Sequence, residues 1–145
     1  MGKNITEVNE QLKSFFENNY NDTTFFEDDS FTITKGSTQV MVKADNITED
    51  HVVIDLVSHV VKDANVDSDI KNFLLRANSE LKFGGFGLLF DDTIIFQHSI
   101  LANEFSEANL MSSINAVASV ADYYDDIIVE KAGGKRALDD LEVDS

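Results

Sequence analysis

The sequence predicts an α+β fold: a single two-layer domain in which an antiparallel sheet carries helices packed on one face. Two observations lead to this prediction. In three segments, apolar residues recur every three or four positions, which is the pattern of a helix with one buried side. Between these segments, shorter runs alternate apolar and polar residues or are apolar throughout, which indicates strands. The expected order of elements is α-β-β-β-α-β-β-α.

The chain of 145 residues has the length of one domain, and it contains no cysteine. A chain of this size buries roughly 68–70% of its unfolded surface, so it needs no disulfide to be stable. We expect the domain to span residues 1–132. Gly133-Gly134 would end the last helix, and residues 133–145 would form a short acidic tail that is frayed or weakly helical.

The first half of the chain is expected to form a helix and three strands. The helix begins after Asn4, whose side chain can accept a free backbone N–H group of the first turn. Its apolar stripe consists of Ile5, Val8, Leu12, Phe15 and Phe16. The strands lie within residues 30–34, 39–43 and 51–61. The first two are apolar on one side, whereas the third is apolar on both.

The second half is expected to begin with a helix that starts at Asp67 or Ser68. Its buried stripe consists of Ile70, Phe73, Leu74, Ala77 and Leu81. A long last helix follows the hairpin described next, and Ser106 caps its first turn. Its stripe consists of Leu110, Ile114, Val117, Ala121, Tyr124 and Ile128.

Two apolar, β-rich runs within residues 82–102 meet at Asp91-Asp92, which indicates a hairpin. If its loop has two residues, residue 90 pairs with residue 93. The pairs that follow are Leu89–Ile94, Gly87–Phe96 and Gly85–His98. Aromatic or branched side chains occur on both faces, so the sequence leaves open which face points to the core.

The helices can cover only one face of the sheet, so the other face needs a separate cover. The candidate residues for this partner surface are Met41, Val53, Val57, Ile94, Phe96 and His98. An exposed apolar patch of several hundred Å² usually marks an interface. We therefore expect a homodimer or a bound protein or peptide segment to supply the cover. The alternative is that the first helix or the tail folds over this face.

The charge of the chain is strongly unbalanced, with 27 acidic and 11 basic residues and a net charge of −16. Affinity for nucleic acid comes largely from Lys and Arg, and anionic lipid also repels such a chain. We therefore expect no nucleic-acid partner and no membrane partner. The sequence has no apolar stretch of signal-peptide or membrane-span length, so a cytoplasmic location is expected.

Recognisable catalytic chemistry is missing, and we expect no enzyme activity, no cofactor and no metal site. The three histidines do not assemble by sequence, and no cysteine can serve as nucleophile or ligand. One alternative is a small metal-dependent or acid–base hydrolase, because paired carboxylates can do acid–base work when burial separates their pKa values. Its residues would be the cluster on the last helix, Asp122, Asp125, Asp126 and Glu130.

The run FGGFGLLFDDTIIFQHSIL, the following SSINAVASVADYYDDII and the order of elements resemble the YbjN-type domain family. The shared pattern is a Phe/Gly strand, an acidic turn, an apolar strand and a long helix that carries Ala118, Ala121, Asp122 and Tyr124. The resemblance covers about residues 5–131. One departure is Asp91-Asp92, where an Asp-Gly turn is expected.

That family is similar in fold to type III secretion chaperones, which are small acidic α+β homodimers that hold partner polypeptides. The resemblance therefore implies a secretion-chaperone-like fold in a bacterial protein. It also implies a non-enzymatic, protein- or peptide-binding chaperone-like or regulatory module that acts as a homodimer.

Overall fold

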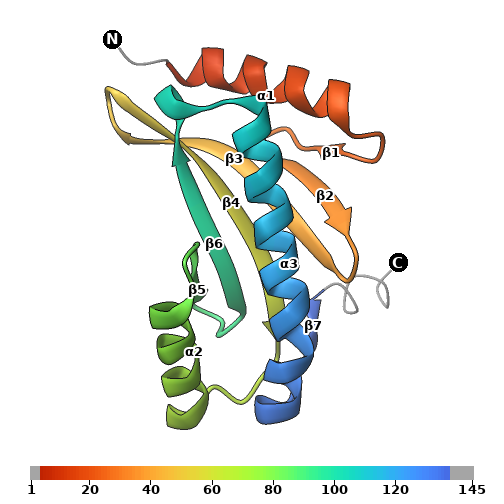
Figure 1. The fold of residues 1–145 in the computed structure, drawn as a ribbon, viewed down its shortest axis with the longest axis vertical. Helices are drawn as coiled ribbons and strands as arrows, with labels where there is room; N and C mark the ends of the chain where they lie inside the picture. The colour runs from red at the N-terminus through yellow and green to blue at the C-terminus, as the bar shows by residue number, and fades with distance from the viewer. Residues whose placement is uncertain (1–3, 138–145) are drawn as a thin grey trace.

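Figure 1 shows the fold in a computed structural model, which describes residues 4–137. The helices pack against one twisted antiparallel sheet, which confirms the predicted α+β class and the predicted order of the main elements. The elements are α1 (Ile5–Asn19), β1 (Thr24–Phe25), β2 (Phe31–Lys35), β3 (Thr38–Thr48), β4 (His51–Lys62), α2 (Ser68–Glu80), β5 (Gly85–Leu88), β6 (Ile94–Leu101), the 3₁₀ turn η1 (Ala102–Glu104), α3 (Glu107–Ala132) and β7 (Lys135–Arg136).

The sheet has the order β1-β2-β3-β4-β6-β5, and neighbouring strands are antiparallel throughout. The two-residue strands β1 and β7 were not predicted from the sequence. β7 pairs with Val61 and Lys62 at the end of β4, on the side opposite β6. The central strand β4 is therefore paired along both sides for much of its length.

The core lies between the sheet and the helices α1 and α3. Even-numbered residues of β3 and β4 point into it, which follows from the two-residue period of a strand. Its largest fully buried side chains include Leu12, Phe15, Phe16, Ile54, Leu56, Phe96, Leu110, Ile114 and Ile128. Burying one such side chain contributes about 1.5–3 kcal/mol, so this layer accounts for much of the stability.

Each helix begins at a residue whose side chain accepts a backbone N–H group of the first turn, as the sequence predicts. The acceptor and donor residues are Asn4 and Glu7, Asp67 and Ile70, and Ser106 and Asn109, with N···O distances of 2.9, 3.0 and 3.1 Å. None of the helices within residues 4–137 is both long enough and apolar enough to cross a membrane.

The predicted register of the β5–β6 hairpin is wrong by one residue. The observed pairs are Leu88–Ile94, Gly87–Ile95, Phe86–Phe96 and Gly85–Gln97. Asp92 adopts a left-handed conformation with φ 65°, and its N–H group donates to the carbonyl of Leu89. The loop consequently has three residues rather than two, because aspartate tolerates the backbone conformation that glycine usually supplies.

Burial in the structure settles which face of the hairpin points inward. Phe86 and Phe96 now lie opposite each other, with ring centroids 5.1 Å apart, and both are buried on the helix side. The glycines Gly85 and Gly87 belong to the other face of the strand, since side chains alternate along it.

Candidate peptide-binding surface

The outer face, by which we mean the face of the sheet that points away from α1 and α3, carries the odd-numbered residues of β3 and β4. Its residues form rows across the strands. One row contains Met41, Val57 and Gln97, the next contains Lys43, Asp55 and Ser99, and the third contains Asp45, Val53 and Leu101. The face is therefore apolar in part, with a polar row between two rows that carry aliphatic side chains.

The structure divides the six predicted surface residues between the two faces. Met41 and Val57 are half-buried neighbours on the outer face, and Val53 lies on the same face but is only 8% exposed. Ile94 and Phe96 are 0% exposed and belong to the helix-covered core. The sequence could not make this distinction because both faces of β6 carry apolar residues, and only packing against the helices decides which face is buried.

His98 also lies on the helix side of the sheet, opposite Leu56. Its ring stacks on Phe83 with the centroids 3.7 Å apart. Burial lowers the pKa of His98 below its usual value of 6.5, since the charged imidazolium loses its hydration there.

Leu101 is an outer-face residue that the prediction missed. Leu101 pairs with Val53 and is 49% exposed, so it extends the apolar part of the third row. The alternation of apolar and polar residues in β6 is the signal that could have indicated it, since Leu101 shares its face with Gln97 and Ser99.

A hollow of about 300 Å³ lies on the outer face across β2, β3 and β4, and we call it the Met41 hollow. Its lining residues include Thr32, Gln39, Met41, Val57, His59 and Lys62. Burial, with Lys62 close by, lowers the pKa of His59. The hollow thus combines an aliphatic floor, made by Met41 and Val57, with polar and basic groups around it.

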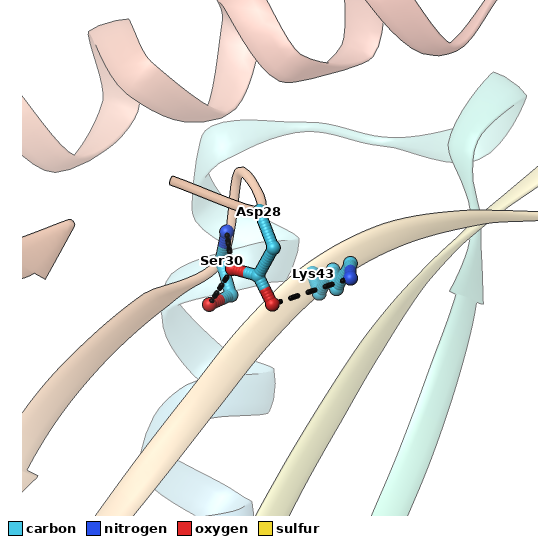
Figure 2. A network of polar contacts seen from close by, with 3 residues as sticks. All are labelled: Asp28, Ser30 and Lys43. Carbon is cyan, nitrogen blue, oxygen red and sulfur yellow. Dashed lines mark hydrogen bonds and ion pairs between the residues drawn. The ribbon is translucent and has the colours of Figure 1, made fainter. Parts of the chain in front are cut away.

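The polar row is tied to the loop before β2. Asp28 accepts hydrogen bonds from the backbone N–H and the hydroxyl of Ser30, and it pairs with Lys43 at 3.4 Å (Figure 2). These interactions lower the pKa of the Asp28 carboxyl, with the Ser30 hydroxyl as the largest cause. Lys43, which lies in the row next to that of Met41, is thereby paired with Asp28.

A second apolar surface, which the sequence analysis missed, lies between α2 and the edge strand β5. Leu75 is 67% exposed and Leu88 is 40% exposed, and the two line one shallow pocket together with Phe86. Leu75 lies outside the predicted buried stripe of its helix. An apolar residue on the polar side of an amphipathic helix was therefore the signal available in the sequence.

The edge of the sheet at β5 is closed by a side chain of α2. Asn78 accepts a hydrogen bond from the Phe86 N–H group at 2.7 Å and donates one to the Phe86 carbonyl at 3.2 Å. The backbone groups that an added strand would need at Phe86 are consequently satisfied within the subunit. A strand added at this edge would therefore find no free backbone group at Phe86.

The acidic cluster of α3 does not assemble a catalytic site. Asp122, Asp126 and Glu130 are exposed, whereas Asp125 is 1% exposed and accepts a hydrogen bond from Ser37. Within residues 4–137, no group of three or more acidic or histidine side chains is arranged to hold a metal ion. The hydrolase alternative therefore has no support in the geometry.

The comparisons with known proteins agree with this arrangement. Residues 5–140 match the family described as "T3SS (YopN, CesT) and YbjN peptide-binding chaperone 1". No curated protein matches the sequence. The family match confirms the predicted resemblance and also the prediction of a binding module rather than an enzyme, because the family is one of peptide-binding chaperones.

Three solved structures have a similar fold at low sequence identity. The chain shares 14% identity with the structure of the ExsC–ExsE complex, at a TM-score of 0.67, covering 88% of this chain and 97% of that chain. With the HopA1–SchA chaperone–effector complex the identity is 10% and the TM-score is 0.64, and the match covers 86% of this chain and 98% of that chain. With the Yersinia pestis type III secretion chaperone SycH, in complex with a stable fragment of YscM2, the identity is 17% and the TM-score is 0.54. This match covers 80% of this chain and 98% of that chain.

These likenesses show the secretion-chaperone fold. Together with the match over nearly the whole chain, they lead to one conclusion: the protein belongs to the family of type III secretion and YbjN peptide-binding chaperones.

Proposed function

We propose that this protein is a non-enzymatic chaperone-like or regulatory module that acts as a homodimer and holds a segment of a partner polypeptide on the outer face of its sheet. The observation that carries the proposal is the Met41 hollow, where aliphatic side chains of two central strands stand on the face that α1 and α3 leave uncovered.

The partner segment would bury apolar side chains against Met41 and Val57. Its polar groups would contact the adjacent polar row of the outer face. Removing apolar surface from water contributes about 25 cal/mol per Å², and pockets for individual side chains provide selectivity. The net charge of −16 would keep the complex soluble and disfavour polyanions. The partner is accordingly a protein or peptide rather than nucleic acid or a membrane surface.

The similar structures support a polypeptide partner. Their descriptions name a complex of ExsC with ExsE, a chaperone–effector complex of HopA1 with SchA, and SycH bound to a fragment of YscM2. They support one class of ligand for this chain, namely a segment of another protein.

The surface around Leu75 and Leu88 supports the homodimer. It combines exposed leucines with an edge strand whose Phe86 backbone groups are already satisfied by Asn78, so side-chain packing between two copies is the favoured contact. Substituting Leu75→Asp should convert a dimer to monomers, as measured by light scattering on a sizing column. A wild-type mass of one chain at micromolar concentration would reject the dimer.

Affinity capture with matched variants tests the binding surface. Wild-type protein and the control Ile47→Asp, which changes an exposed residue at the tip of the β3–β4 hairpin, should retain the same polypeptide from native lysate. Val57→Asp should lose it while keeping the wild-type circular dichroism spectrum. Retention of the polypeptide by a folded Val57→Asp protein would contradict the proposed surface.

A further inference from the structure

The chain after α3 crosses from the helix layer to the end of the sheet. Gly133 and Gly134 adopt positive φ angles of 75° and 82°, which ends the helix and turns the chain toward β4. β7 then pairs with Val61 and Lys62 beside the lower ends of α3 and β4 (Figure 1). A Cβ atom on Gly134 would stand 2.4 Å from the carbonyl oxygen of Lys62. The close approach of this segment to the backbone of Lys62 therefore requires a glycine at position 134.

The described part of the chain ends inside the Met41 hollow. Ala137 follows β7 directly, is only 5% exposed, and lines the hollow together with Met41 and Val57. By contrast, α1 packs with even-numbered residues of β3 in the helix-side core. The first helix and the C-terminal tail were the two segments of the chain that could cover the outer face. Because α1 packs on the other face, only the C-terminal tail remains as a candidate.

The residues that follow Ala137 match the hollow in chemistry. Their sequence is LDDLEVDS, in which Leu138 and Leu141 are three positions apart and four residues are acidic. The hollow offers the aliphatic Met41 and Val57 together with the basic Lys62 and the imidazole of His59. In a chain with 27 acidic and 11 basic residues, a place where a lysine adjoins an apolar floor suits an acidic, leucine-containing segment.

We propose that the Met41 hollow binds residues 138–145 of the same chain, with Leu138 and Leu141 as the apolar anchors. The site thereby selects acidic, leucine-containing segments. Where the hollow also receives a partner, a consequence that rests on the proposed function, the tail is an internal competitor that the partner must displace. A tethered segment has an effective concentration on the order of millimolar, so partner segments with weak affinity would be excluded.

The methionines provide a direct test in the full-length protein. The chain has three, of which Met41 lines the hollow and Met111 packs against the helix-side core. In a protein labelled with ¹³C at the methionine methyl groups, the double substitution Leu138→Ser/Leu141→Ser should shift the Met41 signal and leave the Met111 signal in place. Ile47→Ser, at an exposed position in β3, is the matched control and should shift neither signal.

Adding the free peptide ALDDLEVDS to the double variant should return the Met41 signal toward its wild-type position. The same peptide should have little effect on the wild-type protein, whose own tail occupies the hollow at higher effective concentration. An unchanged Met41 signal in the double variant overturns the proposal. A shifted signal that excess peptide does not reverse also overturns it, because the tail would then act from outside the hollow.

Partner capture separates this inference from the proposed function. If both proposals hold, the double variant should retain more of the captured polypeptide than the wild-type protein does. Suppose that the Met41 signal responds to the tail substitutions as expected, but that neither the wild-type protein nor the double variant captures a polypeptide in a way that depends on Val57. The binding of the tail is then supported and the proposed function is rejected. If capture depends on Val57 but the Met41 signal does not change in the double variant, the proposed function is supported and the binding of the tail is rejected.

Discussion

Ser37 donates its hydroxyl to the buried carboxylate of Asp125, with 2.8 Å between Oγ and Oδ2, and so joins the β2–β3 turn to α3. The same hydroxyl contacts Asp122. A hydroxyl group has a single proton to donate, so it cannot satisfy two ionised carboxylates at once. The Asp126 N–H group donates to Asp125 as well, and Arg136 of β7 exerts an attraction on it. This carboxylate is thus in contact with the hairpin turn and under the influence of the C-terminal strand.

Asp125→Asn should change how stability depends on pH. Burial is the largest cause that raises the pKa of Asp125 above its ordinary value of 3.8. A raised pKa in the folded state means that folding binds a proton, so the contribution of Asp125 is favourable at low pH and is lost as pH rises through the folded-state pKa. The stability of Asp125→Asn relative to the wild-type protein should therefore increase between pH 4 and pH 7.

Urea unfolding across this pH range measures the effect. Asp126→Asn, which removes an exposed charge from the next position of α3, is the control. A stability difference between Asp125→Asn and wild type that stays constant with pH would contradict the assignment of a raised pKa.

His98→Phe should make the protein less sensitive to mildly acidic pH, because the wild-type protein loses stability there. Because burial lowers the pKa of His98 below 6.5, the unfolded chain binds a proton more readily than the folded one. The wild-type contribution is thus present above pH 6.5 and is lost as pH falls through the folded-state pKa. Phenylalanine keeps the stacking on Phe83 and does not titrate. Thermal unfolding between pH 7.5 and 5 should show a smaller decrease in Tm for His98→Phe than for His51→Gln, an exposed-site control.

Gly134→Ala should detach β7, whereas Gly133→Ala should not. Both glycines have positive φ, and Gly133 also has ψ −158°, so any other residue is strained at either position by about 1–3 kcal/mol. At Gly134 the added Cβ would also clash with backbone atoms of Lys62 and Ala64, while at Gly133 it meets no atom within 4 Å. Hydrogen exchange at the β4–β7 pairing should therefore accelerate much more in Gly134→Ala. Equal exchange in the two variants would mean that the close approach of backbones does not hold β7.

Asn78→Ala should loosen the edge strand β5. It removes both side-chain hydrogen bonds to Phe86, each of which contributes about 0.5–1.5 kcal/mol. Asn78→Asp is the matched variant, because its carboxylate can accept from the Phe86 N–H group but cannot donate to the carbonyl. We expect stability in the order wild type, Asn78→Asp, Asn78→Ala, measured by urea unfolding at pH 7. A stable Asn78→Ala protein would show that the edge is held by side-chain packing alone.

Local signals made the helices predictable. Asn4 and Ser106 were predicted as first-turn acceptors, and the start of α2 was predicted at Asp67 or Ser68, because this interaction involves residues only three positions apart. The same holds for the buried stripes, since a helix repeats every 3.6 residues whatever packs against it. The hairpin register failed for the opposite reason. A two-residue and a three-residue loop are both compatible with Phe90-Asp91-Asp92, and the backbone of Asp92 decided between them.

The amino-acid sequence by itself determined the α+β class, the order of the main elements, the starts of the helices and the resemblance to peptide-binding chaperones. Each of these depends on periodicity or on contacts between near neighbours in the chain. Only the tertiary structure decided that Ile94 and Phe96 belong to the core while Met41 and Val57 remain on the outer face. A shift of one residue in strand pairing moves every side chain to the opposite face, and that shift depends on packing between segments far apart in the sequence.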